Sequence, residues 1–264
     1  MSNDNNNNHT ANNPRVGLFV TCLVDLLRPS VGFASVKLLE QAGCRVEVPA
    51  LQTCCGQPAY NNGDCENTRA IAKQVIAAFD EYDYVVAPSG SCCGMLRKHY
   101  VDLFPTDAEW FGKARSFAQR CFELTSFLTD VLGVERCEAQ FASTATYHDS
   151  CSGLRELGIR QQPRKLLSTV RDTTLTEMDE NEVCCGFGGT FCVKYPQISE
   201  RMVSDKIANI KKTGADTVLG GDLGCLLNIA GRLKRMDEPC KVYHVAEVLA
   251  GMTDVPAIGE PEAS

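Results

Sequence analysis

The chain has 264 residues, fifteen of them cysteine, and a formal net charge of −7. This charge argues against nucleic-acid binding, which needs clustered lysine and arginine to neutralise phosphates. The first residues contain no apolar run of the secretory type, and no later stretch approaches the ~18 consecutive apolar residues of a membrane span. We therefore expect a cytoplasmic protein with no transmembrane segment of its own, in which cysteine serves metal binding or catalysis rather than disulfide bonding.

The chain has an asparagine-rich start, which predicts a disordered tail at residues 1–13. After this start, two kinds of apolar pattern alternate along the chain. Short β-type runs are followed by longer stretches with helical periodicity. The predicted strands are residues 16–20, 45–50, 83–87, 145–148, 174–178 and 216–220. The predicted helices are residues 30–42, 66–79, 123–132, 199–212 and 245–250. Strands that alternate with helices indicate parallel sheets.

One cysteine pattern occurs twice. Its members are Cys22, Cys54, Cys55 and Cys92 in the first half, and Cys151, Cys184, Cys185 and Cys225 in the second. The adjacent pair follows the first cysteine of its copy by 32 residues in one half and by 33 in the other, and a glycine follows each pair. The last cysteine follows the pair by 37 and 40 residues. A duplicated unit explains this match far better than chance does.

In each copy, all three predicted strands end shortly before a cysteine or a cysteine pair. Ligands in open parallel sheets collect outside the carboxyl ends of the strands, so the four cysteines of a copy are expected to converge at one edge. We predict an α/β protein of two tandem, pseudo-symmetric units, each with a small parallel sheet flanked by helices. The units are expected at residues 14–137 and 138–255, followed by a tail at residues 256–264.

Four converging thiolates suit either tetrahedral zinc or an iron–sulfur cluster. Zinc ligands usually come from a knuckle in which two to four residues separate the cysteines, whereas the pairs here are adjacent. A multi-iron target accommodates two neighbouring side chains more easily than a single ion does. We therefore predict iron–sulfur clusters, of the [4Fe–4S] type, held by the eight cysteines. Zinc in one or both units, and sites without metal, are the alternatives.

The sequence resembles the CCG-domain or cysteine-rich-domain family, in which a cysteine, a Cys-Cys-Gly run and a Cys-x-x-Cys pair recur twice at similar intervals. The resemblance spans about residues 14–251 and is strongest to the short lactate-utilisation members. It is carried by QPAYNNG (57–63), PSGSC (88–92), YHDSC (147–151), CCGFGGTFCVK (184–194) and DLGC (222–225). The sequence departs from the family pattern where Met95 and Asn228 replace the last cysteine of each copy, which leaves four ligands per copy instead of five.

The resemblance implies an iron–sulfur subunit of a multi-component L-lactate oxidation system, which relays electrons from the oxidation of lactate to pyruvate. It implies other iron–sulfur or redox subunits as partners, through which the protein would be peripheral to a membrane. Other members of the family suggest a glycolate oxidase or a heterodisulfide-reductase-like complex instead. A zinc-stabilised assembly module without a redox role is a further alternative, and the resemblance assigns no catalytic residue.

Several residues beside the eight cysteines are candidates for tuning such a centre. His148 precedes Cys151 and would act as a proton relay or hydrogen-bond partner, unless it is a structural histidine. Gly188 and Gly189, close to Gly186, could bring backbone N–H groups near cluster sulfurs, or form a plain turn. Extra ligand roles are considered for two further cysteines, Cys93 and Cys192. Three arginines after Cys151 could attract a carboxylate, or form a solvated helix face; they are Arg155, Arg160 and Arg164.

Overall fold

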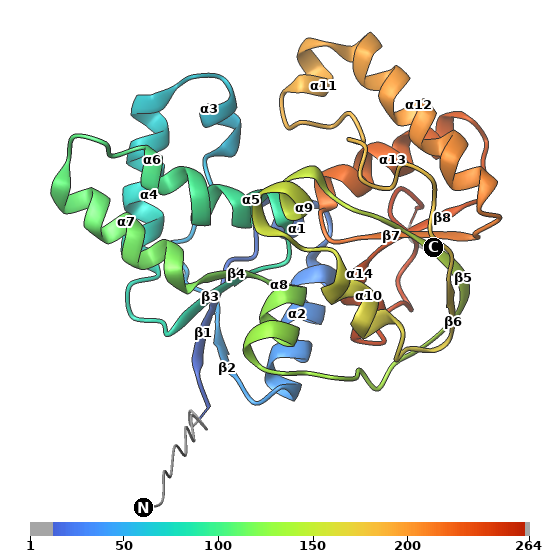
Figure 1. Ribbon diagram of the computed structural model, residues 1–264, viewed down its shortest axis with the longest axis horizontal. Coiled ribbons are helices and arrows are strands. Elements are labelled where there is room, and N and C mark those ends of the chain that lie inside the picture. Colours follow the sequence, from blue (N-terminus) through green and yellow to red (C-terminus); the bar gives the residue numbers. More distant parts are fainter. Residues whose placement is uncertain (1–12, 262–264) are drawn as a thin grey trace, which may run out of the picture.

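The computed structural model describes residues 13–261 and contains two four-stranded sheets in which all paired strands are parallel (Figure 1). The first sheet consists of β1 (Arg15–Leu18), β2 (Arg45–Glu47), β3 (Tyr84–Ala87) and β4 (Cys121–Glu123). The second consists of β5 (Gln140–His148), β6 (Arg171–Leu175), β7 (Thr217–Gly220) and β8 (Lys241–His244). The predicted fold class, two tandem α/β units with parallel sheets, is confirmed.

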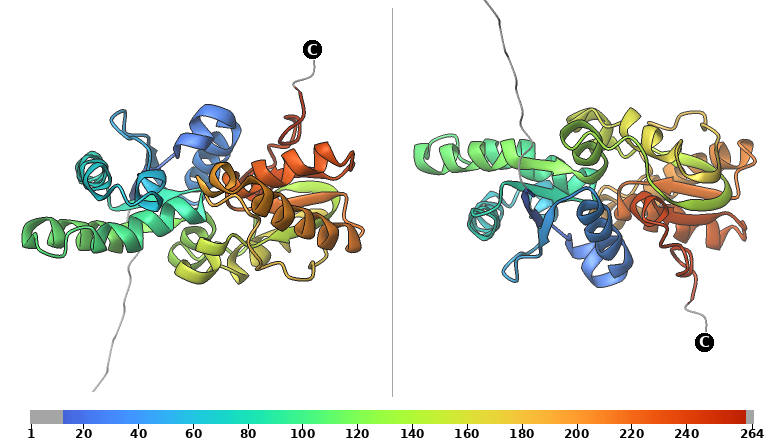
Figure 2. Two further views of the ribbon diagram at one scale, coloured as in Figure 1. Left: turned by 90° about the horizontal axis from the view of Figure 1, so that it is seen from above. Right: turned by 90° about the horizontal axis from the view of Figure 1, so that it is seen from below.

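Helices connect the strands and cover the sheets (Figure 2). The first half contains α1 (Cys22–Leu27), α2 (Pro29–Gln41), α3 (Gln57–Asn61), α4 (Cys65–Ala78), α5 (Gly90–Gly94), α6 (Tyr100–Asp102), α7 (Ala108–Arg120) and α8 (Leu124–Ser126). The second contains α9 (Cys151–Leu157), α10 (Gln161–Leu167), α11 (Phe191–Lys194), α12 (Pro196–Lys212), α13 (Leu223–Arg235) and α14 (Val245–Leu249). Two π-helical turns are η1 (Met95–His99) and η2 (Phe127–Val131). Among residues 13–261, no helix is long and apolar enough to cross a membrane.

The two sheets share one topology, with strand orders β2-β1-β3-β4 and β6-β5-β7-β8. The register is also shared, because Val16 of β1 pairs with Tyr84 of β3 as Ala145 of β5 pairs with Thr217 of β7. Each sheet has one strand more than the three predicted. The extra strands, β4 and β8, have three and four residues, too few to give a clear alternating pattern. In addition, β4 begins just before the stretch expected to be helical, residues 123–132.

The extra strands end at buried titratable residues instead of cysteines. Glu123 ends β4 and caps α8 by accepting hydrogen bonds from the N–H groups of Thr125 and Ser126. His244 ends β8 and caps α14 by accepting one from the N–H of Ala246. Equivalent positions in the two sheets therefore have the same local role with different chemistry.

The two halves share a core. One hydrophobic cluster includes Leu18 and Val86 of the first sheet and continues to Val218 and Val242 of the second, whereas Val85 faces a separate cluster under α4 and α7. Helix α5 packs against α9, and α2 packs against α14. We conclude that burial of apolar side chains holds the halves together as well as each half.

The predicted unit boundaries at residues 137 and 138 fall in the connection between η2 and β5. Residues 1–12 of the expected N-terminal tail and residues 262–264 of the C-terminal one lie outside the described residues. Within the latter segment, Ala257 and Ile258 are buried, and the Ile258 N–H donates to the carbonyl of Val242 in β8 at 2.9 Å. Part of residues 256–264 therefore packs on the second sheet.

Candidate metal centres

The first site is the group Cys22, Cys54, Cys55 and Cys92. Cys22 begins α1 directly after β1, the adjacent pair lies in the loop after β2, and Cys92 lies in α5 after β3. The Sγ atoms of Cys22 and Cys54 are 3.7 Å apart, and those of Cys55 and Cys92 are 3.4 Å apart. The structure thus brings the sulfur atoms together at the carboxyl edge of the first sheet, as the strand ends predict.

The second site is the group Cys151, Cys184, Cys185 and Cys225. Cys151 begins α9 after β5, the pair lies in the loop between β6 and α11, and Cys225 lies in the first turn of α13 after β7. The thiol of Cys184 interacts with Cys151 and Cys185, and Cys185 also interacts with Cys225. The four cysteines therefore follow the same three strand ends in both halves.

The thiols at each site are too close to ionise independently. Hydrogen bonds from Cys22 and Cys55 lower the pKa of Cys54 to about 2, and a hydrogen bond to Cys54, with burial, raises the pKa of Cys22. In the second site, a hydrogen bond from Cys151 likewise lowers the pKa of Cys184 to about 2. One thiolate per site is stabilised by its neighbours, while full ionisation of all four requires a compensating cation.

Both Cys-Cys pairs turn at a glycine in the left-handed region. Gly56 has φ 81° and Gly186 has φ 84°, values that a residue with a Cβ adopts only with strain. A Cβ on Gly186 would also lie 2.7 Å from the carbonyl oxygen of Ser199 in α12. The Gly186 N–H donates to Cys184 Sγ at 3.4 Å, which is the kind of amide-to-sulfur contact that tunes a metal–thiolate centre.

The other predicted tuning residues lie in different places. Gly188 and Gly189 have positive φ values of 51° and 63°, and the latter lines a cavity at the first site instead of the second. Cys192 donates to the Gly189 carbonyl at 3.4 Å and lines a separate cavity of about 430 Å³. Cys93 is buried, and beside Glu123 it lines another cavity, of about 310 Å³.

The two sites differ in what lies under the sulfur atoms. His148 ends β5, and one of its ring nitrogens lies within 4.8 Å of the sulfur atoms of Cys185 and Cys225. Burial, with the nearby charge of Lys206, lowers the pKa of His148 to about 3, so the ring is neutral. The equivalent residue of the first copy, three positions before Cys22, is the buried Phe19.

Lys206 is a feature of the second site that sequence reasoning missed. Its side chain is buried in α12, and its Nζ donates to the backbone carbonyls of Glu180 and Asn181. Helices α4 and α12 bury matching positions, 131 residues apart: Thr68, Ala72, Val75 and Ile76 match Ser199, Val203, Lys206 and Ile207. The available signal was therefore a lysine on the apolar stripe of α12, where the first copy has valine.

Of the three arginines considered for carboxylate binding, Arg164 has its carboxylate partners within the protein. Arg164 binds both carboxylate oxygens of Asp149, at 2.9 and 2.8 Å, and both of Glu177, at 2.6 and 2.9 Å. Asp149 is buried and the Arg164 side chain is only 12% exposed. This pair neutralises the aspartate that lies two residues before Cys151.

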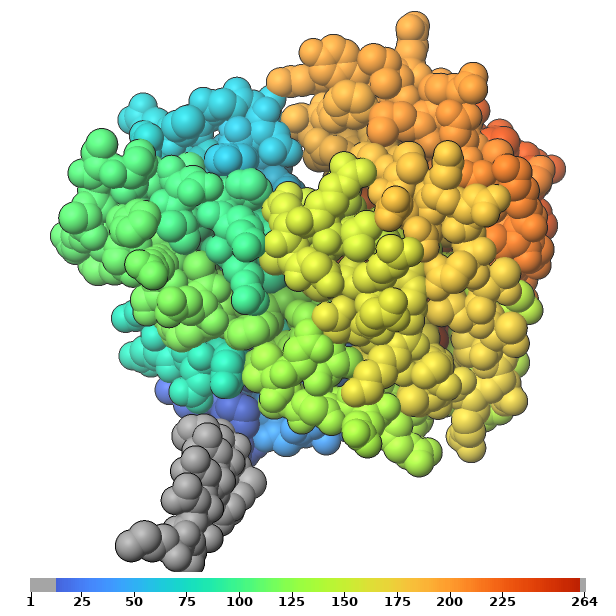
Figure 3. Space-filling model, in the orientation of Figure 1, coloured from blue at the N-terminus to red at the C-terminus, as the bar shows by residue number. Residues whose placement is uncertain are grey.

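A cavity of about 190 Å³ opens onto the first site and is lined by both halves. All four cysteines of the first site line it, together with Phe187, Gly189 and Thr190 from the loop that follows the second cysteine pair. Figure 3 shows the surface hollowed between the segments around α3 and α11. The ring of Phe187 packs on Gly224, where a Cβ would lie 2.5 Å from it. The loop of the second site thus forms one wall of the first.

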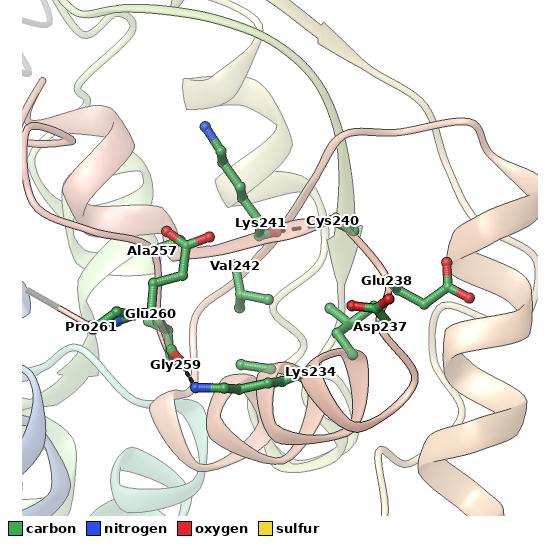
Figure 4. Close-up of a pocket in the computed structure, with 13 residues that line it drawn as sticks. Lys234, Asp237, Glu238, Cys240, Lys241, Val242, Ala257, Gly259, Glu260 and Pro261 are labelled. Carbon is green, nitrogen blue, oxygen red and sulfur yellow. Dashed lines mark hydrogen bonds between the residues drawn. The ribbon is translucent and has the colours of Figure 1, made fainter.

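Another cavity, of about 210 Å³, lies at the opposite edge of the second sheet (Figure 4). It is bordered by Lys241, where β8 begins, and by Lys234, whose Nζ donates to the Gly259 carbonyl at 3.3 Å. The metal-site cysteines follow strand ends, whereas this cavity lies at a strand start. It is therefore separate from both sites.

The residues at the two sites fit a thiophilic metal. Each site offers four thiols from three segments. The sulfur atoms of the first site contact one another in two pairs, and the Gly186 amide is already directed at a sulfur atom of the second. Such a donor set suits zinc or iron–sulfur, and hard cations such as magnesium prefer oxygen. The geometry therefore supports metal binding without deciding between these two.

The cysteine-rich domain family called CCG matches residues 16–97 and 145–230, which are the two copies. The chain belongs to this family. It is 50% identical over 235 residues to lactate utilization protein A of Bacillus subtilis (strain 168) and to that of Geobacillus kaustophilus (strain HTA426), covering 89% of this chain and 98% of each relative. Lactate utilization protein A 2 of Bacillus cereus (strain Q1) is 47% identical over 236 residues, with the same coverage.

Among solved structures, a hypothetical protein from Helicobacter pylori has a TM-score of 0.65 to this chain at 12% sequence identity. The match covers 95% of this chain and 52% of that one, so the present chain spans about half its length. This likeness concerns the fold alone.

Proposed function

We propose that the chain is an iron–sulfur subunit of a multi-component system that oxidises L-lactate to pyruvate, and that it relays the electrons released. The observation that carries the proposal is the convergence of four thiols at each of two equivalent sites. The names of the relatives, which are lactate utilization proteins, supply the substrate. When bound, an iron–sulfur cluster supplies one-electron chemistry at a potential set by its surroundings.

The chain's own residues would hold and tune the two centres. The eight site cysteines would be the ligands, and the Gly186 N–H, directed at Cys184, would stabilise negative charge on sulfur. The positive charge of Lys206 near Cys185 would favour a reduced state at the second site. No equivalent cation is present at the matching position of the first site, Val75. Electrons would therefore be more stable on the second centre.

The metal is tested by analysis of the full chain purified without oxygen. We expect iron and acid-labile sulfide, with broad thiolate-to-iron absorption near ~400 nm. Replacing Cys54 or Cys184 by alanine should remove about half of the iron and sulfide, because each change affects one of two sites. The matched control is Cys65→Ala, an exposed cysteine outside both sites. Stoichiometric zinc without sulfide would contradict the proposal and favour a zinc-stabilised assembly module.

The substrate is tested on the complex isolated from its natural host. Addition of L-lactate should bleach the absorption near ~400 nm, as dithionite does, because electrons reach the chain through its partners. Bleaching by dithionite but not by lactate would leave an iron–sulfur protein and refute the lactate assignment. Glycolate and a heterodisulfide, tested in parallel, separate the other activities suggested by the family.

A further inference from the structure

His148 is a buried side chain whose ring nitrogens lack partners. It is 1% exposed, and neither Nδ1 nor Nε2 forms a hydrogen bond within the described residues. The backbone of Asn181 lies nearby without reaching hydrogen-bond geometry. Buried polar atoms are nearly always paired, so an imidazole left in this state indicates a partner of another kind.

Another buried histidine of this protein, His244, has hydrogen-bond partners for both ring nitrogens. His244 occupies an equally buried position, but its Nδ1 accepts the Ala246 N–H at 3.2 Å and its Nε2 lies 3.2 Å from the Pro88 carbonyl oxygen. Both of its nitrogens are used. His148 instead has a nitrogen within 4.8 Å of two cysteine sulfur atoms. Of these two buried imidazoles, the one that supports the backbone has both nitrogens paired, and the one beside the cysteines has neither paired within the described residues.

The surroundings of His148 suit a metal ligand. A ligating imidazole is neutral and commonly directs its other nitrogen toward a backbone carbonyl, which fixes the ring orientation. The nearby backbone carbonyl of Asn181 could serve this role. Its oxygen accepts a hydrogen bond from Lys206 Nζ at 3.3 Å. The ring is anchored at the end of β5, whose pairing with β7 sets the direction of the side chain toward Cys225.

We propose that His148 is a nitrogen ligand of the metal centre at the second site, so that the two centres have different donor sets. The inference rests on the proposed function, because it requires metal at that site. The first centre has no such donor, since Phe19 occupies the equivalent position. A neutral imidazole adds a donor without the negative charge of a further thiolate, and imidazole-ligated iron–sulfur centres have higher reduction potentials than those with thiolate ligands alone. The second centre would therefore be the stronger electron acceptor.

The test is nitrogen hyperfine spectroscopy on the reduced full chain, prepared without oxygen and labelled with ¹⁵N-histidine. We expect a strong nitrogen coupling, of the size of a direct bond, in one of the two centres. His148→Cys should abolish this coupling while iron and sulfide stay unchanged, and should lower the potential of that centre alone. His148→Phe, which copies the first site, should also abolish it. The matched control, His99→Gln, changes a histidine outside both sites and should keep the coupling.

The outcomes separate the two proposals. Full iron and sulfide with only a weak nitrogen coupling, or with a strong one that survives in His148→Cys, would overturn the ligand role and leave the proposed function intact. Zinc without sulfide would overturn the proposed function instead. In that case the chain is loaded with ¹¹³Cd, and splitting of one cadmium resonance by ¹⁵N of His148 supports the ligand role, whereas its absence refutes it.

Discussion

Glu123 makes the stability of the fold depend on pH in a direction opposite to that of most acidic residues. Its side chain is buried at the end of β4, against Gly221 of the other half. Burial raises its pKa from 4.5 to about 7, and hydrogen bonds from Thr125 and Ser126 oppose this only in part. The folded state therefore binds the proton more tightly than the unfolded state does.

The sign and size follow from linkage. Below pH 4.5 the carboxyl is protonated in both states, and above pH 7 it is ionised in both, so the free energy of unfolding falls as pH rises between these values. The two pKa values differ by somewhat more than two units, which corresponds to about 3 kcal/mol. In Glu123→Gln the side chain keeps an oxygen acceptor for α8 and never ionises. The variant should therefore gain about 3 kcal/mol relative to wild type between pH 5 and pH 8.

The assay is urea unfolding of both proteins at a series of pH values under the same metal loading. Comparing the variant with wild type cancels contributions from His244 and the cysteines, which titrate in both proteins. Glu109→Gln is the matched control, because its side chain is 71% exposed, and its difference from wild type should stay constant within about 0.5 kcal/mol. If the Glu123→Gln difference is equally constant across the series, the reasoning about burial is wrong.

Two further changes test the surroundings of the second site. Asp149→Asn should destabilise the fold by about 3–5 kcal/mol, because it leaves Arg164 without its buried partner. The control Asp205→Asn, which removes a charge from an exposed pair, should cost under about 1 kcal/mol. Urea unfolding measures both free energies, and equal costs would contradict the reasoning about the buried pair. Gly186→Ala should lower iron binding at the second site, because its Cβ would lie 2.7 Å from a backbone oxygen of α12. The control is Gly214→Ala, which is also at positive φ but has open space around it. It should lower the stability of the fold by only about 1 kcal/mol and leave the iron content unchanged. Loss of iron in both variants would point to general unfolding.

The positions of the eight cysteines could be predicted because they depend on local patterns alone. Each follows a short apolar run, and parallel strands bring their carboxyl ends to one edge. The sulfur contacts between Cys22 and Cys54 and between Cys55 and Cys92 agree with this reasoning. Whether the cysteines act as ligands stays a prediction.

The environment of the sites could not be predicted in the same way, because it depends on long-range packing. Lys206 lies on the apolar stripe of α12, but its position there does not show what its ammonium group binds, and only the loop carrying Glu180 and Asn181 makes its burial tolerable. The pairing of Arg164 with Asp149 likewise needs α10 to return beside the end of β5. Sequence periodicity records which face of an element is apolar, but not which polar groups meet across elements.

Hydrogen bonds link the two halves between the helices that carry the last cysteine of each site. Asp222 stands at the N-cap position of α13, which carries Cys225, and its carboxylate accepts hydrogen bonds from Ser89 Oγ at 3.1 Å and Ser91 N at 2.8 Å. Both serines lie at the start of α5, which carries Cys92. The first half by itself would lack this acceptor for the start of α5. One residue thus links the start of the helix that carries Cys225 to the start of the helix that carries Cys92.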